Sequence, residues 1–244
     1  MRYTGESHKV GRSIIAVFRL IFLVLTPIVV FSISAMPSIF LAASYISYLY
    51  PLLPWFWFFF FLPFILVIGF LLLILSTAFF TGITIRLFRL TYSEGEYRKS
   101  ITDKNTYHFA LYWILYRPTE KLLSTIFIPP IYSSYLRLIG AKIGKHVFFG
   151  GRNTISDPCV TEIGSKTLIG GGATIMSHLG EEKLVIRKVT IGSHCLVGAE
   201  ALIMPGVVME DNSVLGGKSL VTKNKVLKKG SMYGGVPAVK IDRN

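Results

Sequence analysis

The sequence predicts a parallel β-helix with triangular coils, preceded by a two-helix transmembrane hairpin and interfacial helices. A six-residue repeat over residues 143–226 predicts the β-helix. A run of 66 residues without Asp, Glu, Lys or Arg, between Arg19 and Arg86, predicts the hairpin. We therefore divide the chain into the hairpin with its basic cytoplasmic flanks (1–99), a helical connector (100–140), the β-helix (141–226) and a basic C-terminal tail (227–244).

The hairpin is predicted from length and flanking charge. The charge-free run is about three times the ~20 residues that cross a bilayer. We place the spans near residues 13–34 and 55–85, joined by a segment rich in Pro and Tyr. Basic residues flank the pair but are missing from the joining segment, so both termini and the β-helix are expected on the cytoplasmic side of the inner membrane. The alternatives are a cleaved signal peptide and a third span over residues 38–50.

Residues 100–140 form the connector. Aromatic and aliphatic side chains over residues 107–116 recur at helical spacing, and Pro118 is expected to end that helix. A second helix is expected over residues 120–128, before Pro129. Two placements stay open, because such helices can lie in the membrane interface or pack against the base of the β-helix.

The repeat defines which residues face inward. Three units make one coil, and inserted residues leave a solenoid as loops at its corners. The register breaks by two residues after Ile155 and by ten after Ile175. By unit count these residues lie on the same face of adjacent coils, about 4.8 Å apart, so Asp157 and His178 are expected to be neighbours. The twelve inward residues that open the units are Ile143, Phe149, Ile155, Ile163, Ile169, Ile175, Ile191, Val197, Ile203, Met209, Leu215 and Val221.

His178 is the candidate general base. It stands where the chain leaves the coils for the ten-residue excursion, and an imidazole can accept a proton near neutral pH. The alternative is an exposed loop histidine. Asp157 is expected to orient the imidazole or bind a substrate hydroxyl, or else it only forms a turn before Pro158.

The other histidines and the cysteines predict no metal site. His146 and His194 take the same position in their units but lie two coils apart, about 9.6 Å, so they cannot share a metal within one chain. Cys159 and Cys195 are expected as free thiols in a reducing compartment. A catalytic thiol at Cys159 is the alternative.

The net charge of +13 favours an anionic lipid surface and phosphate-bearing ligands. Nucleic acid is not expected as a partner, because no recognition helix, aromatic RNA-binding signature or zinc spacing accompanies the charge. A basic cluster near the C-terminus is expected to hold a diphosphate, unless it is only a solvated surface. Its members are Lys218, Lys223, Lys225, Lys228, Lys229, Lys240 and Arg243.

Ordered motifs within residues 140–240 resemble the hexapeptide-repeat acyltransferases, such as galactoside and maltose acetyltransferases. The resemblance implies left-handed coils, a homotrimer, and a coenzyme A thioester (acetyl-CoA) bound between subunits at positions matching Ala199, Gly217 and Lys223. It also implies that His178 deprotonates a hydroxyl or amine acceptor, which then attacks the thioester. The motifs are Ser177-His178 before the excursion, Thr190-Ile191-Gly192 at re-entry, Met204-Pro205-Gly206-Val207, and Gly235-Val236-Pro237-Ala238.

The acceptor does not carry over from that family. Soluble sugar acetyltransferases have a short helical segment where this chain has a hairpin, so a lipid-linked or otherwise membrane-associated acceptor is expected. Residues 138–144 and 215–221 also look like the terminal domain of membrane-bound peptide synthetases, which implies amide-bond formation from an activated or carrier-bound amino acid as an alternative. A non-catalytic trimeric scaffold is a further alternative. A metal-dependent hydratase would need three converging histidines, which the spacing does not provide.

Overall fold

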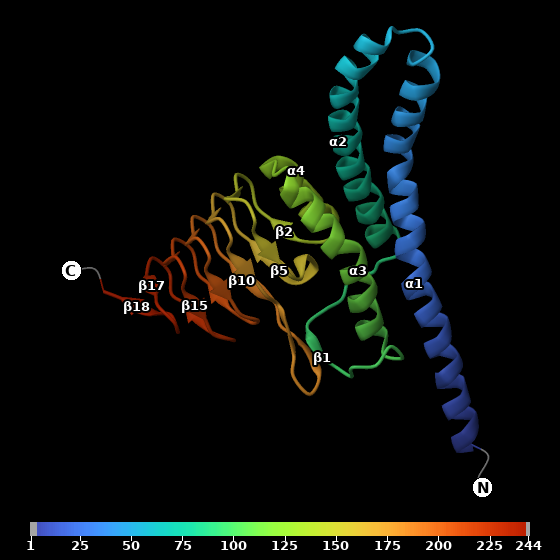
Figure 1. Ribbon diagram of the computed structural model, residues 1–244. Coiled ribbons are helices and arrows are strands. Elements are labelled where there is room, and N and C mark those ends of the chain that lie inside the picture. The colour runs from blue at the N-terminus through green and yellow to red at the C-terminus, as the bar shows by residue number, and fades with distance from the viewer. Residues whose placement is uncertain (1–3, 243–244) are drawn as a thin grey trace.

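The computed structural model describes residues 4–242, with side chains from Ile14 onward. Two long helices lie beside each other, two shorter helices follow, and the rest of the chain winds into a β-helix whose coils step away from the helices toward the C-terminus (Figure 1). The helices are α1 (Thr4–Ser44), continued by a π-helical turn (Tyr45–Leu49), α2 (Trp55–Leu87), α3 (Lys104–Thr125) and α4 (Pro129–Leu138).

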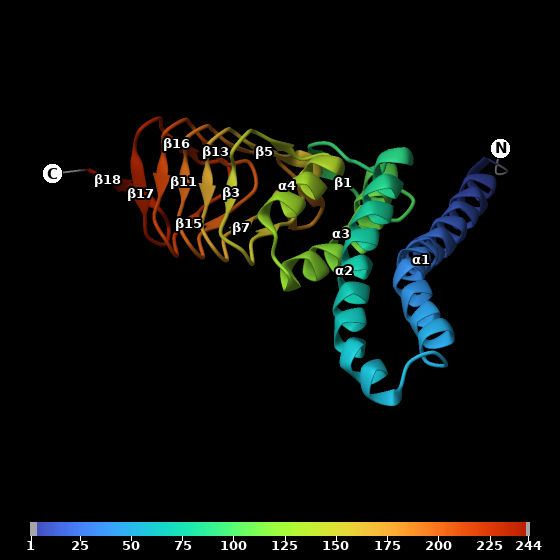
Figure 2. The same cartoon turned by 90° about the horizontal axis from the view of Figure 1, so that it is seen from above.

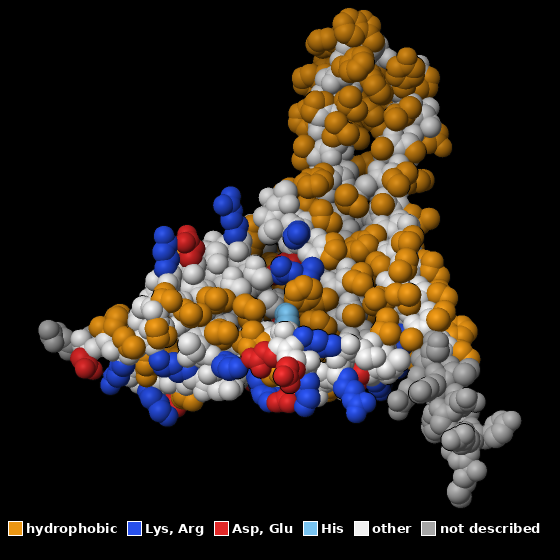
Figure 3. Space-filling model, turned by 60° about the horizontal axis from the view of Figure 1, so that its bottom comes forward, with side chains coloured by type: hydrophobic (Ala, Val, Ile, Leu, Met, Phe, Trp, Pro, Cys, Tyr) orange, Lys and Arg blue, Asp and Glu red, His pale blue; other side chains and the backbone are white. Residues whose placement is uncertain are grey.

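Helices α1 and α2 expose a large apolar surface. By length and composition alone, two segments are long and apolar enough to cross a membrane, Ile14–Leu49 and Trp55–Leu87. Apolar side chains cover this part of the molecule, whereas charged side chains gather over the β-helix and the connector (Figure 3). The chain stays helical through Pro37 and on to Leu49, where a break between the two helices was expected. The good helix formers Leu and Ala follow Pro37, so one missing backbone hydrogen bond does not end the helix.

Helices α3 and α4 lie between the long helices and the β-helix (Figure 2). Helix α3 runs through Pro118, which was expected to end it. The buried face of α3 packs against the start of the β-helix. Tyr112 and Tyr116 on this face are fully buried, and they donate hydrogen bonds to the carbonyls of Ile139 (3.1 Å) and Ile155 (2.7 Å). The connector therefore packs against the base of the β-helix, one of the two placements that the sequence left open, and its position relative to a membrane stays a prediction.

Three parallel sheets form the faces of the β-helix. Ile155, Ile175 and Ile203 stand side by side on adjacent strands, as the six-residue repeat predicts. Every unit opener except Ile143 is buried, with at most 2% of its surface exposed. The repeat and its register are therefore confirmed, and the apolar openers form one continuous core.

The strands, listed by sheet, are β2 (Lys142–Ile143), β5 (Thr161–Ile163), β10 (Val189–Ile191), β13 (Val208–Met209) and β16 (Val226–Leu227); β3 (Phe148–Phe149), β6 (Leu168–Ile169), β11 (Leu196–Val197), β14 (Val214–Leu215), β17 (Met232–Gly234) and β18 (Val239–Ile241); β4 (Thr154–Ile155), β7 (Thr174–Ile175), β12 (Leu202–Ile203) and β15 (Leu220–Val221); and β1 (Gly95–Tyr97), β8 (His178–Gly180) and β9 (Leu184–Ile186).

The coils continue beyond residue 226, where the sequence predicted a tail. Leu227 pairs with Met209, and Tyr233 pairs with Leu215. Both side chains are buried and keep the six-residue spacing from Val221. The surrounding lysines obscured this last part of the repeat in the sequence. Strand β18 then folds back antiparallel on β17 and ends the sheet.

Candidate functional site

His178 and Asp157 are in contact, as the register predicted. The Nδ1 atom of His178 lies 2.7 Å from Oδ2 of Asp157. Each residue follows the inward residue of its strand, Ile175 or Ile155, and these strands are neighbours. The Asp157 side chain is fully buried, while 17% of the His178 side chain is exposed. The pair therefore joins a carboxylate held away from water to an imidazole that reaches the surface.

The Asp157 carboxylate accepts from two further donors. The backbone N–H of Ser177 donates to Oδ2 (3.1 Å), and the phenol of Tyr92 donates to Oδ1 (2.6 Å). Burial raises the pKa of Tyr92 well above its usual value, and the Asp157 charge raises it further, so the phenol stays protonated and remains a donor. The carboxylate can only accept at His178 Nδ1, so in the neutral imidazole the hydrogen sits on Nδ1 and the lone pair on Nε2.

Two aromatic rings from α3 flank the imidazole. The ring centres of Phe109 and Trp113 lie 5.0 and 5.1 Å from that of His178, both in edge-on geometry. The Arg117 guanidinium lies over the Trp113 ring, 5.2 Å from its centre. The sequence marked this stretch as aromatic and helical, but periodicity did not reveal which of its faces meets the coils.

The ten-residue excursion is a β-hairpin. Strands β8 and β9 pair antiparallel, and β1 adds a third strand from the segment that follows α2 (Figure 1). Glu96 on β1 pairs with Arg187 (2.9 Å), and the Glu94 carboxylate accepts from the backbone N–H of Lys188 (3.0 Å). His178 begins β8, and β9 lies between β8 and β1, so the segment leaving α2 joins the sheet that contains His178 through β9.

The three predicted cofactor residues lie at two corners. The register places Gly151, Gly171, Ala199 and Gly217 at one corner of successive coils, and the Lys218 N–H donates to the Ala199 carbonyl (2.8 Å). No side chain in this column is larger than a methyl group, which leaves a smooth edge along the coils.

Lys223 lies at the next corner, after β15. Its Nζ pairs with Glu181 at the tip of the excursion (2.7 Å). Ala199 and Gly217 are therefore together, whereas Lys223 stands apart from them and beside the hairpin that begins with His178.

The lysines near the C-terminus do not converge on one point. Lys218, Lys223 and Lys228 follow strands of three different sheets. Lys218 pairs with Glu200 (3.6 Å) and Lys228 with Glu210 (3.3 Å). The predicted diphosphate cluster is thus spread around the coils, and its member Arg243 lies outside the described residues.

Neither a metal group nor a reactive thiol stands out. Across the part of the chain that the structure describes, no group of three or more His, Cys, Asp or Glu side chains is arranged to hold a metal ion. His146 and His194 occupy equivalent corner positions with φ of 56° and 55°. Burial raises the pKa of Cys159 to about 12, which keeps its thiol protonated and argues against the catalytic-thiol alternative.

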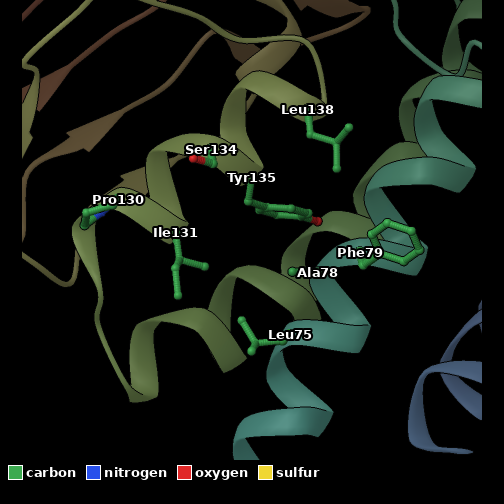
Figure 4. Close-up of a pocket in the computed structure, with 8 residues that line it drawn as sticks. All are labelled: Leu75, Ala78, Phe79, Pro130, Ile131, Ser134, Tyr135 and Leu138. Carbon is green, nitrogen blue, oxygen red and sulfur yellow. The ribbon is translucent and has the colours of Figure 1, made fainter. Parts of the chain in front are cut away.

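An apolar groove of about 330 Å³ lies between α2 and α4 (Figure 4). The Tyr135 phenol on its wall lies 3.2 Å from the Thr81 hydroxyl. The groove shares no lining residue with the His178–Asp157 pair, so it is a separate feature. Its lining residues are Leu75, Ala78, Phe79, Pro130, Ile131, Ser134, Tyr135 and Leu138.

Several solved acetyltransferase structures are similar to part of this chain. Among solved structures, the chain is similar to a hexapeptide-repeat containing acetyltransferase from Vibrio cholerae, with 14% identity over 52% of this chain and 89% of that chain and a TM-score of 0.41. A maltose O-acetyltransferase from Clostridium difficile 630 has 16% identity over 62% and 92%, with a TM-score of 0.46. A galactoside acetyltransferase in complex with coenzyme A has 22% identity over 52% and 79%, with a TM-score of 0.40.

The sequence comparison places the repeat within the coils. No curated protein sequence matches this chain. Residues 188–223 match the family model described as the hexapeptide repeat of succinyl-transferase. This segment runs from the strand at which the chain re-enters the coils to Lys223, and the chain therefore carries hexapeptide repeats, as predicted.

Proposed function

We propose that this protein is a membrane-anchored acyltransferase that moves an acyl group, in the simplest case acetyl, from a coenzyme A thioester to a hydroxyl or amine. The observation that carries the proposal is the His178–Asp157 pair, in which one imidazole nitrogen is held 2.7 Å from a buried carboxylate. The pair lies where the hexapeptide coils give way to the excursion, in the motif order of the hexapeptide-repeat acyltransferases.

In the proposed reaction His178 acts as the general base. Asp157 fixes the orientation of the imidazole, and the Nε2 lone pair takes the proton of the acceptor hydroxyl or amine. The acceptor oxygen or nitrogen attacks the thioester carbonyl and gives a tetrahedral intermediate with a negatively charged oxygen. The intermediate collapses, the carbon–sulfur bond breaks, and the imidazolium returns its proton to the coenzyme A thiolate.

The donor is proposed to lie along the corner that contains Ala199 and Gly217. Small residues leave room there for an extended chain such as pantetheine, and Lys223 lies beside the His178 hairpin, where it can meet a phosphate. A second subunit would pack beside this corner and cover the other side of the bound donor, so we propose a homotrimer.

The acceptor is proposed to be a membrane component, such as a lipid-linked sugar, an amine or a lipid headgroup. Helices α1 and α2 would form a transmembrane hairpin, with the β-helix on the cytoplasmic face of the inner membrane. Strand β1 begins eight residues after α2 ends and pairs with the excursion that His178 begins. The proposed base would then work close to the membrane surface.

A transfer assay tests the activity. The full-length protein in detergent, given acetyl-labelled coenzyme A and a lipid extract of its own membranes, is expected to move label into the organic phase and release free coenzyme A thiol. Omitting the lipid should abolish both signals. If the label stays on coenzyme A with the lipid extract and also with a whole-cell extract, the acyl-CoA proposal is wrong; transfer from an aminoacyl thioester instead would favour amide-bond formation.

Cysteine labelling tests the proposed topology. With Cys159 and Cys195 replaced by Ser, a single cysteine near Pro51, between α1 and α2, is expected to react in intact cells with a reagent that does not cross membranes, because no basic residue holds that segment inside. A single cysteine at the exposed position Lys218 should react only after permeabilisation. Labelling of both positions in intact cells would contradict the cytoplasmic placement of the β-helix.

A further inference from the structure

We propose that Tyr92 is a positioning residue for the His178–Asp157 pair, so that the segment leaving α2 completes a site otherwise built by the β-helix. The kinetic part of this inference rests on the proposed function. Tyr92 stands five residues after the end of α2, and its phenol donates to Oδ1 of Asp157 at 2.6 Å. Only 5% of Tyr92 and none of Asp157 is exposed, so water does not replace this bond.

The two carboxylate oxygens of Asp157 have different partners. Oδ2 lies close to His178 Nδ1 and accepts from the Ser177 N–H, both supplied by the coils. Among the described residues, the donor to Oδ1 is Tyr92. A buried carboxylate that loses a donor keeps an unpaired oxygen, and hydrogen bonds to charged groups are the strong ones. Tyr92 therefore holds the side of Asp157 that faces away from the imidazole.

Two aromatic rings from α3 pack against the Tyr92 ring. It packs edge-on against Phe109 (5.3 Å between ring centres), which in turn touches the His178 imidazole. A second edge-on contact is with Tyr112 (5.4 Å). Farther along the same segment, β1 pairs with the hairpin that His178 begins. The segment after α2 thus contacts Asp157 directly through the Tyr92 side chain, and β1 joins the sheet of His178 through β9.

Removing the phenol should shift the titration of the pair in a defined direction. Without the Tyr92 donor, the Asp157 carboxylate is destabilised most when the His178 imidazole is neutral, because an imidazolium beside it compensates the negative charge. The protonated form of the pair is therefore favoured, and the pair takes up its proton at higher pH. Tyr112 and Cys159, which also face Tyr92, have pKa values raised by burial and stay neutral. The charged groups at the surface hollow beside Tyr92 are Glu94, Lys142, Glu162 and Lys188, and Glu162 pairs with both lysines.

The test compares Tyr92→Phe with Tyr112→Phe in the full-length detergent-solubilised protein. Both changes remove one buried hydroxyl, but the Tyr112 phenol donates to the Ile139 carbonyl and not to the pair. We expect Tyr92→Phe to lower kcat about 10-fold with little change in the KM for the donor, and to move the acid limb of the pH–rate profile to higher pH. Tyr112→Phe should keep the wild-type profile.

A second readout does not depend on activity. The titration midpoint of the His178 imidazole, followed by NMR on histidine-labelled protein, should rise in Tyr92→Phe and stay unchanged in Tyr112→Phe. Wild-type values in Tyr92→Phe, or equal shifts in both variants, would overturn the positioning role. If the wild-type protein transfers no acyl group, the proposed function fails, while the imidazole titration still decides whether Tyr92 positions the pair.

Discussion

Replacing His178 by Ala is expected to lower acyl transfer by roughly 10²–10⁴-fold, the range that a positioned general base supplies. The change removes the Nε2 atom that would take the acceptor proton, but it touches neither the inward residues of the coils nor the Ala199–Gly217 corner. Coenzyme A binding and the oligomeric state of the detergent-solubilised protein should therefore stay as in the wild type. The initial rate of thiol release, isothermal titration with coenzyme A and light scattering measure the three quantities.

His194→Ala is the matched control for this prediction. His194 stands at a corner after β10, in a different sheet of the coils from β7, the strand before His178, and its backbone N–H donates to the Ser165 carbonyl (2.9 Å). Its replacement should change the rate little. A His178→Ala protein with wild-type turnover, or a His194→Ala protein that is equally inactive, would contradict the assignment of His178 as the base and favour the scaffold alternative.

The repeat explains why this pair could be found without a structure. A solenoid converts sequence distance into spatial position, because residues that occupy the same place in neighbouring coils lie one strand spacing apart. The two register breaks, after Ile155 and Ile175, fall on the same face of adjacent coils. Asp157 and His178 follow those breaks and meet at 2.7 Å. Where the period holds, spatial contacts can be read from the sequence.

The partners that come from outside the coils could not be found in this way. Tyr92, Phe109 and Trp113 reach the site from the segment after α2 and from α3, whose paths relative to the β-helix follow no period. Their placement depends on how the connector packs, and packing of one helix on another element is a tertiary property. A Tyr shortly after an apolar helix gave no signal that its phenol would meet a carboxylate 65 residues later.

The helix boundaries that were predicted from prolines are wrong at two positions. Pro37 and Pro118 both lie inside helices, although each was expected at or near a break. A proline removes one backbone hydrogen bond, at a cost of about 3 kcal/mol in an isolated helix interior. Burial of several large side chains on the same face can offset that cost, as Tyr112, Leu115 and Tyr116 do in α3. In α3 the tertiary contacts thus override the local effect of Pro118.

Asp157→Asn is expected to lower the rate by roughly 10–10²-fold, between the wild type and His178→Ala. The amide oxygen can still accept from the Ser177 N–H and from His178 Nδ1, and the Tyr92 hydroxyl can rotate to accept from the new NH₂ group. The imidazole therefore keeps its orientation and its tautomer. What is lost is the negative charge that stabilises the imidazolium formed during the reaction.

The pH dependence separates this loss of charge from a loss of packing. Without the carboxylate the protonated imidazole is less favourable, so the acid limb of the pH–rate profile should move to lower pH, opposite to the shift expected for Tyr92→Phe. Asp157→Ala should cost more, because it leaves the buried Tyr92 O–H and Ser177 N–H without their acceptor and frees the imidazole to turn. If Asp157→Asn keeps both the wild-type rate and the wild-type limb, Asp157 is only a turn residue. If the acid limb of the Asp157→Asn profile moves to higher pH, the carboxylate does not act on His178 through its charge.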